Sequence, residues 1–243
     1  MGGAPFGAHC ARAEGACERV QCYWYVYMGE GGVAVETTRA EDGSTVSPGT
    51  TETPRRARSG SDTRARILAV ASELFYAHGI RATSADRIIE QVGITKVTFY
   101  RHFRTKGELV VAYLQEQAAA EREWMQGLRR EGDAVATLHA LAEGIGDASC
   151  RPGFRGCAFI NASAEFSDPE DPVRVAVGVH REWTFGYFAD IAADAKVDDV
   201  SSAARQLLLL RDGAMVSGYI GEPSAVSDAL DAGFASIVTA PAR

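Results

Sequence analysis

The chain of 243 residues is 46% hydrophobic and 23% charged, which suits one or two globular domains with a sizeable core. Its most apolar stretch, VQCYWYVYM at residues 20–28, falls short of the roughly 18–20 residues of a membrane span, so we expect no membrane segment and no signal peptide. The formal net charge of −7 argues against a polyanionic partner, yet residues 54–106 hold 11 Lys and Arg against 4 Asp and Glu, whereas residues 107–243 hold 11 against 21.

The N-terminal segment shows no sustained hydrophobic period. Gly, Thr, Ser, Pro and Glu dominate from residue 29 to 61, which predicts a disordered arm over residues 1–60. We favour a start of translation at Met28, with residues 1–27 belonging to an over-extended reading frame. The five cysteines are odd in number and match no zinc pattern, so we expect reduced thiols in a cytoplasmic protein, with no metal and no cofactor.

From residue 62 onward the pattern is helical, without strand-like alternation, and predicts an all-α protein. The first helix is expected over residues 62–78. Ser61 or Asp62 would cap its N-terminus, and Gly79 would end it.

Two short helices are predicted next. The first starts at Thr83, with the spacing of a capping box, and runs through Val92. Gly93 can adopt the positive φ of a tight turn, and Thr95 then caps a third helix that ends near Phe103. Braced by the first helix, this pair forms a helix-turn-helix unit.

The third helix carries a cationic face. From Lys96 to Lys106 there are four Lys and Arg side chains and no carboxylate, while Phe99 and Phe103 lie four residues apart and would anchor the helix to the core. Its first residues would meet base edges in the major groove, and later ones the phosphates. The alternatives are a solvated polar face and a chance basic cluster. The predicted DNA contacts are Thr83, Ser84, Thr95, Lys96, Val97, Thr98, Tyr100, Arg101, His102 and Lys106.

Residues 67–110, ILAVASELFYAHGIRATSADRIIEQVGITKVTFYRHFRTKGELV, resemble the DNA-binding domain of the tetracycline-repressor (TetR) family, most specifically from Gly93 to Phe103. The resemblance implies an all-helical homodimeric regulator, a repressor that binds a palindromic double-stranded operator. Its helix-turn-helix domain would span residues 61–107, and a divergent helical regulatory and dimerisation domain residues 108–243. Two positions depart from the family pattern: Val97 stands where a small residue or Pro is usual, and Gly107 where an acid is usual.

The acidic C-terminal half is predicted to be helical. Helices are expected over about 105–130, 157–167, 172–195, 199–221 and 223–239, with the turn CRPGFRG at residues 150–156 as an interruption. The family resemblance implies that the segment from about 199 to 239 pairs with its symmetry mate as a four-helix bundle. The alternative is an ordinary pair of core helices within one chain.

The same half would hold a pocket for a small-molecule effector. Aromatic residues mixed with isolated polar groups are typical of such cavities, although each residue alone is more often plain core. Asn161 and Glu165 would instead be solvent-exposed or capping groups if they are not buried. The predicted ligand contacts are Phe159, Asn161, Glu165, His180, Trp183, Tyr187 and Met215.

The sequence leaves two other functional classes to consider. Cys150 and Cys157, with Arg151 and Arg155 between them, would suit a redox or metal sensor coupled to DNA binding, and the alternative is a pair of inert thiols. An enzyme is disfavoured because the chain contains no HExxH, GxSxG, phosphate-loop or dinucleotide-binding motif.

Overall fold

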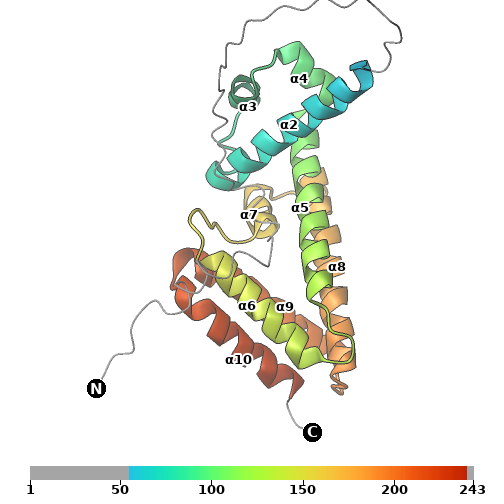
Figure 1. Ribbon diagram of the computed structural model, residues 1–243, viewed down its shortest axis with the longest axis vertical. Helices are drawn as coiled ribbons and strands as arrows, with labels where there is room; N and C mark the ends of the chain where they lie inside the picture. Colours follow the sequence, from blue (N-terminus) through green and yellow to red (C-terminus); the bar gives the residue numbers. More distant parts are fainter. Residues whose placement is uncertain (1–54, 240–243) are drawn as a thin grey trace, which may run out of the picture.

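The computed structural model describes residues 55–239, and this part of the chain is entirely helical (Figure 1). An N-terminal group of three helices stands at one end of the molecule, and a larger helical group forms the rest. The helices are α2 (Arg55–His78), α3 (Ala85–Val92), α4 (Lys96–His102), α5 (Lys106–Leu128), α6 (Ala134–Ser149), α7 (Ala158–Glu165), α8 (Pro172–Asp194), α9 (Val200–Ile220), the 3-10 turn η2 (Pro223–Ala225) and α10 (Val226–Val238).

Helix α2 starts earlier than the sequence pattern predicts. It begins at Arg55, so Ser61 and Asp62 lie inside the helix and neither is its N-cap. The six residues 55–60 therefore belong to a helix and not to the predicted arm, because a Ser and an Asp within a run of helix formers are a weak stop signal. The rest of that arm lies outside the described residues. Gly79 ends the helix as predicted, with a positive φ of 90°.

The helix-turn-helix pair follows its capping chemistry closely. Ser84 caps α3 by accepting a hydrogen bond from the backbone N–H of Arg87, which corrects the assignment of Thr83 as the cap. Gly93 then takes a φ of 73° in the turn, as predicted. Thr95 caps α4 by accepting from the N–H of Thr98.

The long helix α5 connects the N-terminal group to the remainder of the protein. Its start is fixed by reciprocal capping: Thr105 accepts from the N–H of Glu108 at 3.0 Å, and the Glu108 carboxylate accepts from the N–H of Arg104 at 2.8 Å. These two hydrogen bonds hold the start of α5 although Gly107 stands where an acid is usual in the family. Helix α5 then runs alongside α8 down one side of the molecule (Figure 1).

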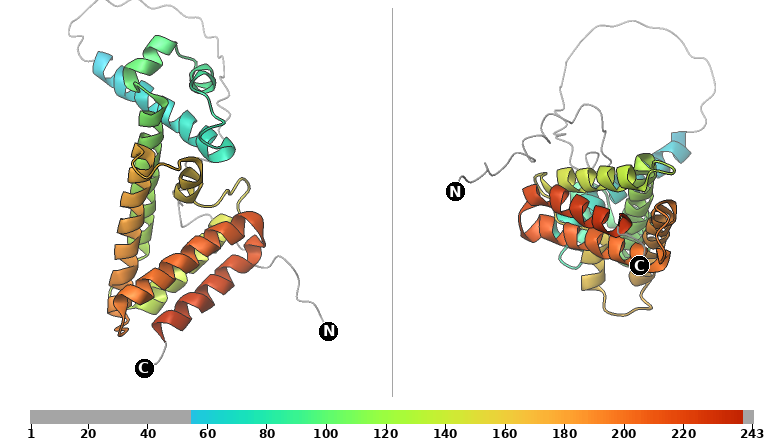
Figure 2. Two further views of the ribbon diagram at one scale, coloured as in Figure 1. Left: turned by 180° about the vertical axis from the view of Figure 1, so that it is seen from behind. Right: turned by 90° about the horizontal axis from the view of Figure 1, so that it is seen from below.

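Helices α6, α9 and α10 pack together at the opposite side of the larger group (Figure 2). Helix α6 was missed, since no helix was predicted between residues 130 and 150. It is capped by Asp133, and its buried face includes Leu138, Leu141 and Ile145. The other predicted helices lie within a few residues of those observed. In the described part of the chain, no helix has the length and apolarity to cross a membrane.

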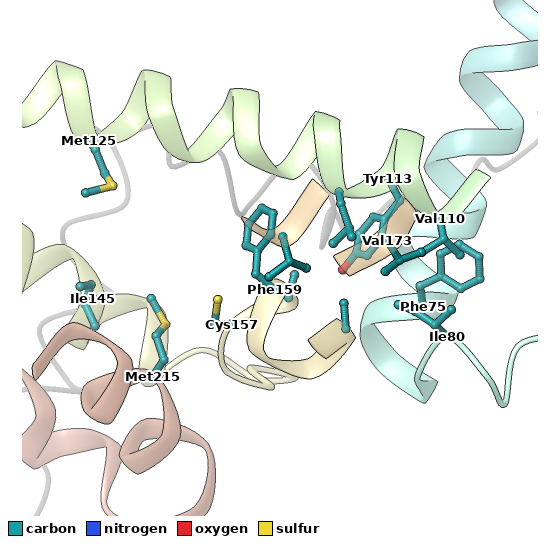
Figure 3. Close-up of a cluster of buried hydrophobic side chains, with 14 of the residues drawn as sticks. Phe75, Ile80, Val110, Tyr113, Met125, Ile145, Cys157, Phe159, Val173 and Met215 are labelled. Atoms are coloured by element: carbon teal, nitrogen blue, oxygen red, sulfur yellow. The ribbon is translucent and has the colours of Figure 1, made fainter. Parts of the chain in front are cut away.

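One hydrophobic core joins the two helical groups. Figure 3 shows Phe75 and Ile80, at the end of α2, beside Val110 and Tyr113 of α5, with Phe159 of α7 in the same cluster. All five side chains are buried. Because interiors pack as densely as organic crystals, a shift of α7 would be felt at the base of the N-terminal group.

Candidate nucleic-acid interface and regulatory cavity

Helix α4 is held to the core by its two phenylalanines, as predicted. Phe99 is fully buried and Phe103 almost so, with their ring centroids 6.4 Å apart. Tyr100 meets the Phe99 ring edge-on at 5.2 Å but remains 47% exposed. The helix is only seven residues long, so these anchors, not intrinsic propensity, fix its orientation.

The opposite face of α4 is exposed to solvent. Val97 is 79% exposed, and Lys96 and Arg101 are exposed as well. Lys96 pairs with Asp86 of α3 at 2.9 Å, and this contact raises the pKa of Lys96 through a side-chain hydrogen bond. Both partners are mostly exposed, so the pair costs little to exchange for a phosphate or a guanine.

Several predicted DNA contacts have constrained positions. Thr83 is completely buried, and its hydroxyl donates to the carbonyls of Leu74 and Gly79, so it is not available to a phosphate; this corrects its assignment. Ser84 remains exposed. His102 and Lys106 are half-buried, and burial lowers the pKa of Lys106.

The hydroxyl groups of Thr95 and Thr98 lie 3.0 Å apart at the start of α4. Thr95 is exposed and Thr98 is half-buried. Both therefore stand at the helix end that would enter a groove.

A clamp connects the N-terminal group to α7. The Glu165 carboxylate accepts hydrogen bonds from the backbone N–H of Ile80, at 2.8 Å, and of Arg81, at 2.6 Å. Close by, the Tyr76 hydroxyl accepts from the N–H of Arg155 and donates to the carbonyl of Gly156. Burial of the hydroxyl is the main reason that the pKa of Tyr76 is raised to about 12. The end of α2 is therefore bonded to both ends of the segment that contains α7.

Between α7, α8 and α9 lies a cavity of about 340 Å³. Its walls combine apolar side chains with three guanidinium groups and one carboxylate. The lining residues are Cys157, Phe159, Ile160, Ser163, Arg174, Val177, Gly178, His180, Arg181, Thr184, Leu208, Arg211 and Asp212.

Buried charges form one side of this cavity. Glu121 of α5 contacts Arg211 through one carboxylate oxygen and lies 3.3 Å from His180 Nε2 through the other. All three side chains are more than nine-tenths buried. Burial by itself would raise the pKa of Glu121, but Arg211 and His180 outweigh it and lower the pKa from 4.5 to about 2. The pKa of Arg211 is raised, because Glu121, Cys157 and Asp212 together outweigh its own burial.

The seven predicted ligand contacts do not share one cavity. Phe159 and His180 line the cavity between α7, α8 and α9, with their rings stacked 3.7 Å apart. Trp183 and Tyr187 line a second, more open depression of about 620 Å³ between α5 and α8. Burial raises the pKa of Tyr187 to about 12, and its hydroxyl donates to the carbonyl of Met125.

The other three serve the framework of the fold. Asn161 donates to the carbonyl of Arg155, Glu165 forms the clamp on α2, and Met215 is buried in the core. Sequence analysis did not identify Glu121 and Arg211, which form the buried ion pair beside the cavity. The sign that could have revealed Arg211 was its position inside the apolar run LLLLRDGAMVSGYI.

The two cysteines of the C-terminal half, Cys150 and Cys157, have different environments. Cys157 is a free, buried thiol whose Sγ lies 3.4 Å from Arg211 Nη1. Cys150 stands at the C-cap of α6, where its backbone N–H donates to the carbonyl of Gly146 at 3.1 Å. Within residues 55–239, no group of three or more His, Cys, Asp or Glu side chains is arranged to hold a metal ion.

Comparison with known proteins places these features in a family. Residues 67–113 match the family model described as bacterial regulatory proteins, tetR family. A crystal structure of a TetR-family transcriptional regulator from Streptomyces coelicolor is 38% identical, with a TM-score of 0.69, over 73% of this chain and 95% of that one. The reduced form of NemR from E. coli shares the fold at 22% identity and a TM-score of 0.67, over 75% of this chain and 100% of that one.

Curated relatives match over shorter stretches. The transcriptional activator FasR from Mycolicibacterium smegmatis is 34% identical over 85 residues, which cover 35% of this chain and 39% of FasR. The regulator TtgR from Pseudomonas putida is 38% identical over 60 residues, which cover 25% of this chain and 29% of TtgR. The matches to these two relatives thus span well under half of their lengths.

Proposed function

We propose that this chain, which belongs to the TetR family of bacterial transcriptional regulators, is a ligand-responsive repressor. It would act as a homodimer on a palindromic operator. The observation that carries the proposal is helix α4: its phenylalanines are buried in the core while Lys96, Val97 and Arg101 are exposed. This helix belongs to the group that stands at one end of the molecule (Figure 1). A recognition helix presented in this way suits the major groove.

Roles can be assigned along the interface. Lys96 would donate to guanine O6 and N7, and Val97 would contact a thymine methyl group. Tyr100 and Lys106 would reach flanking phosphates. These contacts set position and affinity, while those of Lys96 and Val97 set sequence preference. Thr95, Thr98, Arg101, His102 and Ser84 are proposed as supporting contacts, and Thr83 is not.

The test is selection of an operator from a random duplex library, followed by binding measurements at several salt concentrations. Lys106→Ala should lower the affinity for all duplexes alike and reduce the slope of log affinity against log salt by about one. Tyr100→Phe should weaken binding without changing that slope. Lys96→Ala should relax selection at one base pair, which costs about 1–3 kcal/mol of discrimination. Unchanged binding in all three variants would remove the assigned interface.

The homodimer is supported by an apolar stripe on α9. Leu209 is 61% exposed, Val216 43% and Ile220 74%, and these residues recur on one face of the helix with Gly213 between them. An ordinary helix within one chain would bury such a face. A second copy of α9 and α10 would cover it, consistent with a four-helix interface around a two-fold axis.

The response to an effector is proposed to pass through α7. This helix contributes Phe159, Ile160 and Ser163 to the cavity wall and Glu165 to the clamp on α2. A ligand that favours a second position of α7 would therefore change the placement of the two reading heads and release the operator by population shift.

A thiol-based sensor is the second candidate, because Cys157 lies at the cavity wall beside the guanidinium of Arg211. Alkylation with N-ethylmaleimide should then release the operator from the native chain and leave the Cys157→Ser complex intact. Equal release from both proteins would exclude this thiol as the sensor.

A further inference from the structure

The charge balance of the cavity between α7, α8 and α9 leaves a cationic surplus. Three guanidinium groups, from Arg174, Arg181 and Arg211, line the walls. Asp212 pairs with Arg181 at 2.6 Å and with Arg211 at 3.2 Å, and Glu121 pairs with Arg211 from behind. Two carboxylates are therefore available to neutralise three guanidinium groups.

Arg174 is the guanidinium left over. It is half-buried on α8, and its Nη1 donates to the carbonyl of Phe166 at 2.9 Å. Among the side chains that the structure describes, it forms no ion pair. A cation at the wall of a partly enclosed cavity, with no anion beside it, favours the binding of one.

His180 adds an independent sign of a missing partner. The ring is 3% exposed, its Nε2 faces Glu121 at 3.3 Å, and its Nδ1 has no hydrogen-bond partner. Buried polar atoms of this kind are almost always paired. The Phe159 ring stacks on the imidazole at 3.7 Å and fixes its plane, so Nδ1 keeps a defined direction.

The rest of the lining is apolar. Phe159, Ile160, Val177 and Leu208 all contribute to the walls. The volume of about 340 Å³ is near the lower end of the range for small-molecule sites. The cavity therefore suits a compact molecule with an apolar body and one charged end.

We propose that this cavity binds a small organic carboxylate, with its apolar body against Phe159 and Val177 and its carboxylate toward Arg174 and Nδ1 of His180. The inference rests on the proposed function, in which this cavity receives the effector. A carboxylate has the planar pair of oxygens that a guanidinium binds best.

The experiment is calorimetric titration of the full chain with 3-phenylpropionate and octanoate, and with 3-phenylpropionamide and octanamide as neutral partners of the same shape. At least one acid should bind about tenfold or more tightly than its amide, as expected for a charge-assisted hydrogen bond. Acetate at the same ionic strength should not bind, because it lacks the apolar body. Equal binding of acid and amide, or no binding of either acid, would overturn the proposal.

Variants locate the site. Arg174→Gln should lower the affinity for the acid about tenfold, whereas Arg174→Lys should retain most of that affinity. Arg130→Gln changes an exposed arginine in the loop after α5 and should have no effect. Gly178→Phe should abolish binding by filling the cavity, since a side chain at Gly178 meets open space. Full affinity in both Arg174→Gln and Gly178→Phe would place the ligand elsewhere and overturn the assignment.

Operator binding, measured in parallel without ligand, separates the two proposals. If the native chain binds its selected operator but prefers no acid over its amide, the ligand class is wrong and the DNA-binding function stands. If the acid binds in this cavity but no duplex is preferred, the proposed function fails on its own.

Discussion

At the scale of single residues, the pair of Glu121 and Arg211 is the most exacting feature of the molecule. Both side chains are more than nine-tenths buried, and each depends on the other for its charge. Breaking a buried pair by removing one partner strands the other, which costs about 3–5 kcal/mol. Glu121→Gln should lower the free energy of unfolding by that amount at pH 7, measured by urea denaturation.

The same residue predicts a pH dependence. The folded protein lowers the pKa of Glu121 from 4.5 to about 2, so it holds the charged form more firmly than the unfolded chain does. Its contribution, about 3 kcal/mol, should be complete above pH 4.5 and be lost as the pH falls toward 2. The difference in unfolding free energy between the native chain and Glu121→Gln should therefore shrink between pH 5 and pH 3, whatever the other carboxylates contribute to both. A constant difference would contradict the assignment.

Thr83 tests the correction made at the interface. Its hydroxyl donates to the carbonyls of Leu74 and Gly79 in a fully buried site. Thr83→Val keeps the shape and removes the donor, so it should cost about 1 kcal/mol of stability. It should leave the salt dependence of operator binding unchanged, in contrast to Lys106→Ala. A reduced salt slope in Thr83→Val would return this residue to the interface.

At the scale of elements, the clamp on α2 gives a local prediction. Glu165→Gln keeps one acceptor oxygen for the two N–H groups of Ile80 and Arg81, so one hydrogen bond is lost. Amide hydrogen exchange at these two residues should accelerate about tenfold, equivalent to roughly 1.4 kcal/mol. Glu143→Gln, a change of an exposed carboxylate on α6, should leave both amides unaffected.

Local chemistry explains which elements were predictable. Gly79, Gly93 and Thr95 mark helix ends in the sequence because positive φ and N-cap hydrogen bonds depend on a few adjacent residues. Helix α6 was missed although Asp133 caps it, because its Ala- and Gly-rich pattern carries little contrast between buried and exposed faces. The start of α2 was missed because Ser61 resembled a cap.

The functional sites divide along the same line. The recognition helix could be predicted because its anchors and its exposed face lie within one short segment, from Thr95 to Phe103. The cavity lies between α7, α8 and α9, and Arg211 in its wall is paired with Glu121 of α5, which is 90 residues away in the sequence. Only the tertiary fold reveals that their charges meet. Trp183 and Tyr187 were grouped with the cavity for their residue type, but α8 directs them into a different depression.

At the scale of the whole molecule, charge and symmetry act together. The segment of residues 54–106 is basic and the remainder acidic, so the field of the protein would turn its N-terminal end toward a duplex. One DNA-binding domain would make few base contacts. Two domains related by a two-fold axis would double these contacts in major grooves one helical turn apart. In the proposed homodimer, high affinity for an operator would therefore depend on the exposed stripe of α9.

Leu209→Glu tests this dependence. Leu209 is 61% exposed in the single chain, so a charge there should leave the fold of one chain intact, whereas in a dimer it would be buried opposite its own copy. Light scattering after size exclusion should give the mass of one chain in place of two, and operator affinity should fall about a hundredfold or more, since the two half-sites are no longer bound together. Val135→Glu is the matched control, because Val135 is 50% exposed and lies on α6 instead of α9. A dimer that persists in Leu209→Glu would place the interface on another face, while a monomer with undiminished affinity would show that one head is sufficient.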